Sequence, residues 1–99
     1  MPLSESQKKH LRGLAHKLRP FVMVGQQGLR ESVHEELEQA LTAHELVKVK
    51  VAVGDRTARD AVIRQLCEQS GAELVQRIGN MAVLFRRNPK KPRIELPRH

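Results

Sequence analysis

The chain has 99 residues but no tryptophan or tyrosine, and it has only two phenylalanines and one cysteine. A single cysteine, Cys67, excludes an internal disulfide and a cysteine-based zinc cluster. With Phe21 and Phe85 as the only aromatic residues, the core must be aliphatic, and an RNA reader that stacks bases on an aromatic sheet is disfavoured. No stretch approaches 18 apolar residues, so we expect no membrane-spanning helix and no membrane partner.

The ends of the chain suggest a small cytoplasmic domain with a tail. The N-terminal segment MPLSESQKKH has no apolar run of the kind found in a secretory signal, and the lone cysteine fits a reducing compartment. At this length we expect one domain with one core. The composition shifts at "RNPKKPRIELPRH", which contains three prolines. We therefore predict a domain over residues 1–87 and a basic, proline-containing extended tail over residues 88–99.

Basic residues outnumber acidic ones and are unevenly distributed. The net charge of +7 makes a polyanion the first candidate partner, and nucleic acid is the commonest polyanion. Residues 1–28 hold five Lys or Arg and one Glu, residues 76–99 hold seven and one, and residues 31–45 hold five Glu and no Lys or Arg. This segregation favours a polyanion-binding face, although charge alone does not exclude a basic protein without a site. The acidic helix is most simply a solvated face.

Hydrophobic periodicity predicts the first three elements of the fold. Ser4 and Gln7 have the spacing of a capping box, so a helix begins there and ends before Pro20. Phe21–Val24 is short and apolar, which predicts a strand buried on both faces. Apolar residues at helical spacing predict a second helix from about Leu29 to His44.

The second half of the chain predicts one helix and three strands. In "ELVKVKVAV" valine alternates with lysine, the pattern of a strand, so Lys48 and Lys50 share the face opposite the valines. A helix follows over about Arg56–Gln69, and Gly79-Asn80 joins two further strands in a hairpin. The order helix–strand–helix–strand–helix–strand–strand predicts an α/β two-layer domain with a mixed four-stranded sheet.

Two glutamines lie between two glycines where the first strand gives way to the second helix. Gly25-Gln26-Gln27-Gly28 lacks the third glycine of a dinucleotide fingerprint and the Gly-Lys-Ser/Thr of a P-loop. What remains is a G-x-x-G turn before a helix, the device with which KH modules clamp a nucleic-acid backbone. The structural alternative is a tight turn that needs glycine for steric reasons alone.

The whole chain resembles the CRM domain family, and most of all its stand-alone bacterial members of the YhbY type. The resemblance covers residues 3–97 and rests on "LRGLAHKLRPFVMVGQQGL", "EELEQALTAHELVKVKV", "LCEQSGAELVQRIGNMAVLFR" and "RIELPR". It implies a mixed sheet with helices, similar to the C-terminal domain of bacterial translation initiation factor three. It also implies RNA binding, with bacterial members associated with precursors of the large ribosomal subunit.

The family's G-x-x-G loop falls on Gly25–Gly28, where many members carry a basic residue and this chain carries two glutamines. The charge must therefore come from elsewhere in the chain. We expect the loop and the first helix to form one continuous surface. The candidate RNA-binding residues are Gly25, Gln26, Gln27, Gly28, Lys8, Lys9, Arg12, Lys17, Arg19, Arg30, Lys48, Lys50, Arg86 and Arg87.

No residue pattern predicts catalysis. The histidines are not at metal-ligand spacing, and no nucleophile–base pair or isolated carboxylate pair is evident. We therefore expect no metal, no cofactor, no small-molecule substrate and no enzymatic activity. The leading hypothesis is a monomeric RNA-binding factor in assembly of the large ribosomal subunit. The alternative is an adaptor whose acidic second helix docks a basic ribosomal protein.

Overall fold

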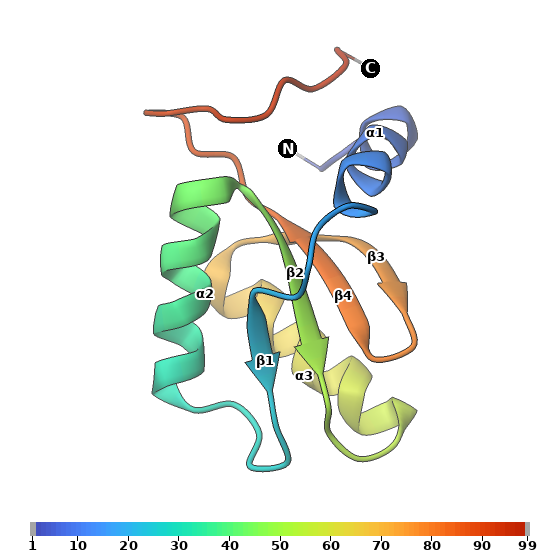
Figure 1. Ribbon diagram of the computed structural model, residues 1–99, viewed down its shortest axis with the longest axis vertical. Coiled ribbons are helices and arrows are strands. Elements are labelled where there is room, and N and C mark those ends of the chain that lie inside the picture. The colour runs from blue at the N-terminus through green and yellow to red at the C-terminus, as the bar shows by residue number, and fades with distance from the viewer. Residues whose placement is uncertain (1, 99) are drawn as a thin grey trace.

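Three helices and one four-stranded sheet make up the computed structural model, which describes residues 2–98 (Figure 1). The elements are α1 (Glu5–Ala15), β1 (Val22–Val24), α2 (Glu31–His44), β2 (Leu46–Val51), α3 (Arg56–Ser70), β3 (Glu73–Ile78) and β4 (Met81–Phe85). The strand order is β1-β2-β4-β3, with β1 parallel to β2 and the other neighbours antiparallel. The predicted order of elements and the mixed sheet are confirmed.

Short-range signals fix the ends of these elements. The Ser4 hydroxyl accepts a hydrogen bond from the Gln7 backbone N–H, while the Gln7 side chain accepts one from the Ser4 N–H, which confirms the capping box. The Asp55 carboxylate accepts from the Ala58 N–H at the start of α3. Gly79 has the positive φ (58°) that the hairpin between β3 and β4 requires.

Two apolar clusters lie on opposite faces of the sheet. On one face, α2 and α3 cover the valines of β1 and β2 together with Ala82 and Leu84 of β4. On the other face, Leu11 and Ala15 of α1 pack on Leu46, Val83 and Phe85. Leu46 is the first residue of β2 and is paired with Phe85, the last of β4. Helix α1 therefore covers only one end of its face (Figure 1).

The prediction that Phe21–Val24 is buried on both faces is wrong. Val22 and Val24 point into the core beneath α2, but Met23 is 61% exposed, and Phe21, just before the strand, is 63% exposed. The reason is position in the sheet. β1 is an edge strand whose second face has no helix over it, because α1 lies at the far end of β2.

The part of the sheet that α1 leaves open carries one mixed row of side chains. The row crosses all four strands through successive register pairs: Met23 with Lys50, Lys50 with Met81, and Met81 with Ile78. The burial pattern of β2 confirms that Lys48 and Lys50 lie on this face, away from the valines. Within residues 2–98, no helix is both long and apolar enough to span a bilayer.

Residues 88–98 form no helix or strand, yet they are held on the domain. Ile94 and Leu96 pack against the α1 cluster, and the Gln7 side chain donates to the Pro97 carbonyl at 2.8 Å. The segment thus lies beside α1 (Figure 1), which brings the basic residues of both chain ends to one end of the molecule.

Candidate nucleic-acid interface

The G-x-x-G loop forms a tight turn at the opposite end of the molecule from α1. Val24, the last residue of β1, is the register partner of Val51 at the end of β2. The Gly28 N–H donates to the Gly25 carbonyl at 2.9 Å, which closes a four-residue turn. Gln26 and Gln27 occupy its two central positions and are exposed. The turn therefore presents two neutral amide side chains and its backbone to solvent.

The backbone conformation favours glycine at one of the two glycine positions of this turn but not at the other. Gly28 has φ of 77°, so its backbone conformation favours glycine in any case. Gly25 has no positive φ, and a Cβ added there would meet no atom within 4 Å. The steric alternative thus accounts for Gly28 but not for Gly25. The fold leaves the space above Gly25 open to a partner.

The start of α2 lies two residues later than predicted. The helix begins at Glu31 rather than Leu29, and its N-cap residue, Arg30, makes no side-chain capping bond. Leu29 packs against the core and so anchors the loop, while the exposed Arg30 side chain is the cation nearest to the turn in sequence. The negative charge of Glu31 in the first turn of α2 disfavours binding of an anion at the N-terminus of this helix.

The first helix and the loop do not form one continuous surface, contrary to our expectation. Helix α1 packs at the Leu46 end of β2, whereas the loop follows the pairing with Val51. These ends are about 16 Å apart along the strand. Because β1 runs parallel to β2, the chain leaves α1 at one end of the sheet and reaches the turn at the other. The basic residues of α1 and of the linker after it therefore lie away from the turn; these are Lys8, Lys9, Arg12 and Lys17.

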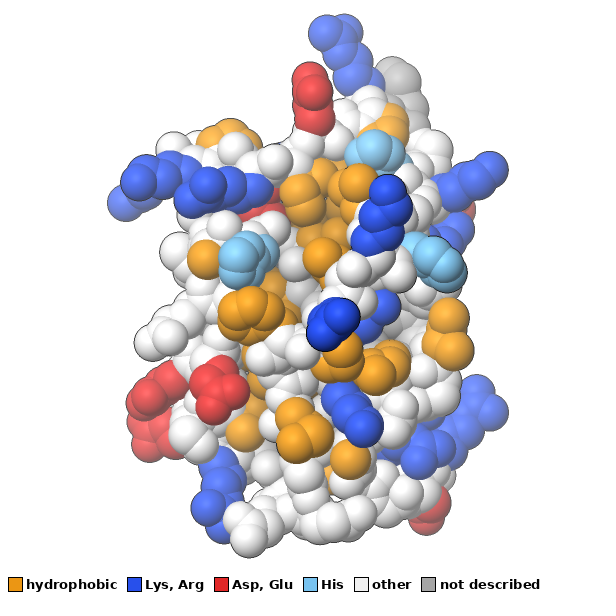
Figure 2. All heavy atoms as spheres, viewed as in Figure 1, with side chains coloured by type: hydrophobic (Ala, Val, Ile, Leu, Met, Phe, Trp, Pro, Cys, Tyr) orange, Lys and Arg blue, Asp and Glu red, His pale blue; other side chains and the backbone are white. Residues whose placement is uncertain are grey.

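Three basic residues lie between these two ends. Lys48 and Lys50 extend from the open face of β2, and Arg19 is exposed in the segment that joins α1 to β1. Figure 2 shows Lys and Arg side chains along the middle of this face, interspersed with apolar ones, while the acidic side chains gather over α2. The open face thus connects the loop to the basic end of the molecule.

Arg86 and Arg87 are committed to contacts within the domain. Arg86 donates to the Glu38 carboxylate at 2.7 Å and to the Ser70 carbonyl at 2.8 Å. Arg87 donates to the Ile94 carbonyl at 2.7 Å and lies over the Phe85 ring at 5.7 Å. Both side chains tie β4 to its surroundings, so the structure gives them a structural role that spacing in the sequence did not indicate.

The glutamates of residues 31–45 are not all a solvated face, which corrects that expectation. Glu31, Glu35, Glu36 and Glu38 are exposed, although Glu38 pairs with Arg86, whereas Glu45 is fully buried. The hydrogen bond from Arg86 lowers the pKa of Glu38, against a smaller opposing effect of burial. Four of the five acids therefore lie on the surface, and within the described residues three of these four make no ion pair.

Glu45 holds the C-terminal segment in place. Its carboxylate accepts from the backbone N–H groups of Asn88 (2.6 Å), Arg93 (2.6 Å) and Ile94 (2.8 Å). Burial raises its pKa, but these three bonds and the nearby Arg87 outweigh burial, so the net pKa lies below its usual value. Its φ is 64°, because the chain passes from α2 into β2 through this one residue. Sequence reasoning missed Glu45, and no local signal marks it.

The metal-ligating residue types and the single cysteine were the other candidates for chemistry. Among residues 2–98, no group of three His, Cys, Asp or Glu side chains is placed to hold a metal ion. Cys67 packs half-buried against the core, and burial raises the pKa of its thiol, which opposes thiolate formation.

Comparison with known proteins identifies relatives over almost the full length. The sequence model of the CRS1 / YhbY (CRM) domain matches residues 3–86. A protein named RNA-binding protein in Haemophilus influenzae is 47% identical over 96 residues, which cover 97% of this chain and 96% of that protein. A protein named probable RNA-binding protein in Pseudomonas aeruginosa is 48% identical over 90 residues, 91% of this chain and 86% of its own length.

A solved structure has the same fold. The solution structure of a hypothetical protein from Staphylococcus aureus, described as a candidate for RNA binding, superimposes with a TM-score of 0.83 at 34% identity. The match covers 97% of this chain and 100% of that one. The fold assignment therefore holds for α1 and the C-terminal segment as well as for the sheet.

Proposed function

Because the chain belongs to the CRS1 / YhbY (CRM) domain family, we propose that it is a non-catalytic RNA-binding protein that holds an RNA backbone at Gly25–Gly28. The names of its relatives in Haemophilus influenzae and Pseudomonas aeruginosa support RNA as the polyanion. The basic composition supports the same class of ligand.

The observation that carries this proposal is the open space at Gly25. Within residues 2–98, no atom lies within 4 Å of a Cβ added at this position, and the residue has no positive φ. At this strand-to-helix turn, a glycine without a side chain leaves room for a ligand to approach the backbone closely. A sugar-phosphate strand can lie there against the turn, with the Gln26 and Gln27 amides as hydrogen-bond partners for phosphate or ribose.

The positive charge that the neutral loop lacks comes from the open face of the sheet. Arg30 lies next to the turn in sequence, Lys50 and Lys48 follow along β2, and Arg19 and Lys17 continue toward α1. Within residues 2–98, none of these five side chains takes part in an ion pair. An RNA strand that leaves the turn along β2 therefore meets unpaired cations.

The resemblance to stand-alone bacterial family members makes ribosomal RNA in precursors of the large subunit the proposed target, bound by a monomer in the cytoplasm. Crosslinking in cells followed by sequencing of the attached RNA tests this target. Enrichment at one region of large-subunit RNA is the expected result. Signal spread over all cellular RNA would reduce the proposal to non-specific binding.

The salt dependence of binding measures how many phosphates are contacted. If the five cations Arg30, Lys50, Lys48, Arg19 and Lys17 each neutralise one phosphate, the logarithm of the binding constant for single-stranded RNA should fall with the logarithm of salt concentration at a slope of about −3.5. Titrations by fluorescence anisotropy at four or more salt concentrations give this slope. A slope near zero would contradict the proposed path along β2.

Reversal of charge on α2 separates RNA binding from the adaptor function. Glu35→Lys combined with Glu36→Lys alters two exposed acids that pair with no residue in the described chain. We expect unchanged or slightly stronger binding of RNA, because repulsion is removed. Co-sedimentation with ribosomal particles should also persist. Loss of co-sedimentation with RNA affinity intact would favour an adaptor that docks a basic protein.

A further inference from the structure

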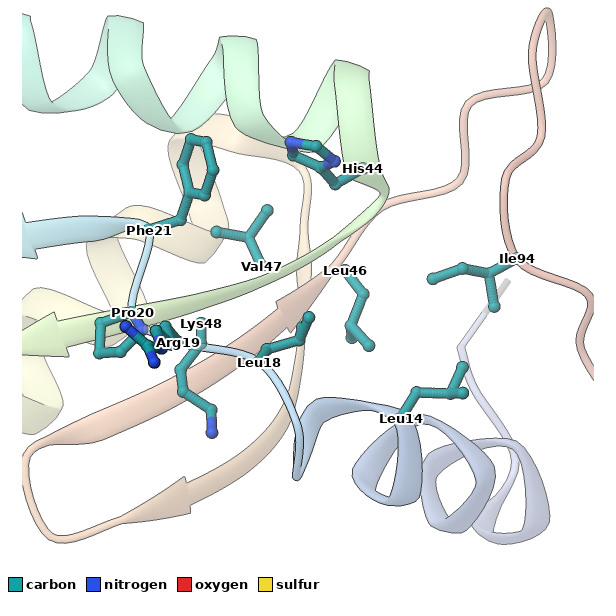
Figure 3. A pocket seen from close by; sticks show the side chains of 10 residues that line it. All are labelled: Leu14, Leu18, Arg19, Pro20, Phe21, His44, Leu46, Val47, Lys48 and Ile94. Carbon is teal, nitrogen blue, oxygen red and sulfur yellow. The ribbon is translucent and has the colours of Figure 1, made fainter.

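A pocket of about 480 Å³ lies beside the first residues of β2 (Figure 3). Its walls come from four segments that are distant in sequence: the end of α1 with the linker that follows it, the end of α2, the start of β2 and the C-terminal segment. It lies at the opposite end of β2 from the Gly25–Gly28 turn. The function proposed above uses two of its lining residues, Arg19 and Lys48, and leaves the pocket itself unassigned.

The pocket exists because β1 is short. Val22, the first residue of β1, pairs with Val49, and the Phe21 N–H donates to the Lys48 carbonyl at 2.8 Å. Among the described residues, none pairs with β2 before that point on this side. Backbone groups alternate between the two sides of a strand, so the N–H and C=O of Leu46 point the same way as those of Lys48. Within residues 2–98, no backbone bond reaches Leu46 from this side.

The side chains that line the pocket combine ring faces, aliphatic surface and positive charge. The Phe21 and His44 ring centroids are 5.1 Å apart with the rings tilted by 59°, so the two rings touch and leave no slot between them. Leu18, Leu46 and Ile94 supply aliphatic surface. Figure 3 shows Arg19 and Lys48 together on one side, with Phe21 and His44 toward α2. No Asp or Glu is among the lining residues.

We propose that this pocket binds one unstacked nucleobase of single-stranded RNA, an inference that rests on the proposed function. A base would stack on the exposed face of Phe21, and its hydrogen-bonding edge would meet the free N–H and C=O of Leu46. Arg19 and Lys48 are placed for the phosphates that flank it. Aromatic stacking combined with hydrogen bonds to the base edge is how proteins read unpaired RNA.

A peptide that adds a strand to β2 could also occupy the pocket. The small number of unpaired backbone groups at the start of β2 disfavours it. A strand that adds to a sheet edge needs several consecutive backbone bonds. Among the described residues, only the N–H and C=O of Leu46 and the N–H of Lys48 are free before Phe21 bonds to the carbonyl of Lys48. Two free donors and one free acceptor suit a base edge and are too few for a strand. Two cations without a carboxylate also suit a phosphodiester better than an apolar peptide.

The test compares a single-stranded 12-nucleotide RNA with the same strand made of abasic ribose and with the corresponding duplex. The full chain should bind the 12-mer about 5- to 150-fold more tightly than the abasic strand, the range for one stacked base. Phe21→Ala should bind the 12-mer and the abasic strand alike, while Phe21→Trp should keep the preference. RNA that carries 4-thiouridine should crosslink to residues 18–21.

Met23→Ala is the matched control, because Met23 is as exposed as Phe21, lies two residues away and is outside the pocket. It should keep the preference for intact bases. If Phe21→Ala binds the 12-mer as tightly as the unaltered chain does, the pocket is not a base site, although the proposed function stands. If Phe21→Ala loses only co-sedimentation with ribosomal particles, the pocket docks a protein and the inference fails. If the unaltered chain binds no RNA, both proposals fail.

Discussion

Gly25→Asp is expected to reduce RNA affinity on the order of 100-fold while the domain keeps its fold. A carboxylate would occupy the open space above the turn, where the proposal places a phosphate, and juxtaposed like charges cost several kcal/mol. The fold should tolerate the change, because Gly25 has no positive φ and an added Cβ meets nothing within 4 Å. Fluorescence anisotropy with single-stranded RNA measures the loss, and thermal unfolding checks the fold.

Gly13→Asp is the matched control for charge. Gly13 is exposed on α1, an added Cβ there also meets nothing, and it lies at the other end of the sheet. A general effect of one added negative charge would weaken both variants equally, and this outcome would argue against contact at the turn. Gly28→Asp is less informative, because φ of 77° at Gly28 adds about 1 kcal/mol of strain to any effect on binding.

Glu45→Ala is expected to destabilise the domain by about 3 kcal/mol, a large share of the stability of a domain of this size. The substitution leaves three backbone N–H groups of the C-terminal segment without their acceptor and removes the partner of Arg87. Denaturant unfolding measures the stability. Hydrogen exchange should show faster exchange at Asn88, Arg93 and Ile94 than elsewhere in the chain.

Two further substitutions separate the contributions of Glu45. Glu45→Gln keeps an acceptor oxygen but removes the charge, so it should lose less stability than Glu45→Ala. Glu45→Gly relieves the positive φ and removes the side chain. If Glu45→Gly were as stable as the unaltered chain, the carboxylate would not be what holds the segment.

At low pH the unaltered chain should no longer be more stable to unfolding than the Glu45→Gln variant. The pKa of Glu45 is lowered in the folded state, so its stabilising effect is fully present above its unfolded pKa, near 4.5. The effect is lost as pH falls through the lower folded value. The difference in unfolding free energy between the unaltered chain and Glu45→Gln should therefore shrink between pH 6 and pH 3. A difference that stays constant over this range would contradict the account.

Much of the fold was predictable because its signals are local. The alternation of valine and lysine in β2 predicted which face is buried and which is open, and the capping box of Ser4 and Gln7 predicted the start of the first helix. Burial in β1 was not predictable in the same way. A run of apolar residues does not indicate whether its strand lies at the edge of the sheet or what covers its second face. Phe21 and Met23 therefore emerged as exposed only in three dimensions.

The candidate site was predictable in part. The loop and the two lysines of β2 depend on nearby sequence, and the structure places them as local patterns indicated. The separation of α1 from the loop depends on the direction of β1. This strand runs from the end of the sheet where α1 packs to the end where the loop lies, so two segments that are close in sequence lie far apart. The roles of Arg86 and Glu45 depend on partners that lie 16 to 49 residues away in sequence. No short pattern encodes such partners.

The short length of β1 also bears on self-association. An uncovered sheet border is a template onto which a second chain can add a strand, and long exposed borders promote aggregation. Here the uncovered part of β2 ends at Lys48, whose carbonyl accepts from the Phe21 N–H, and Arg19 and Lys48 would set two like charges against any approaching copy. At this end of β2 the domain thus keeps backbone polar groups accessible without offering a length of strand to which a second copy could add.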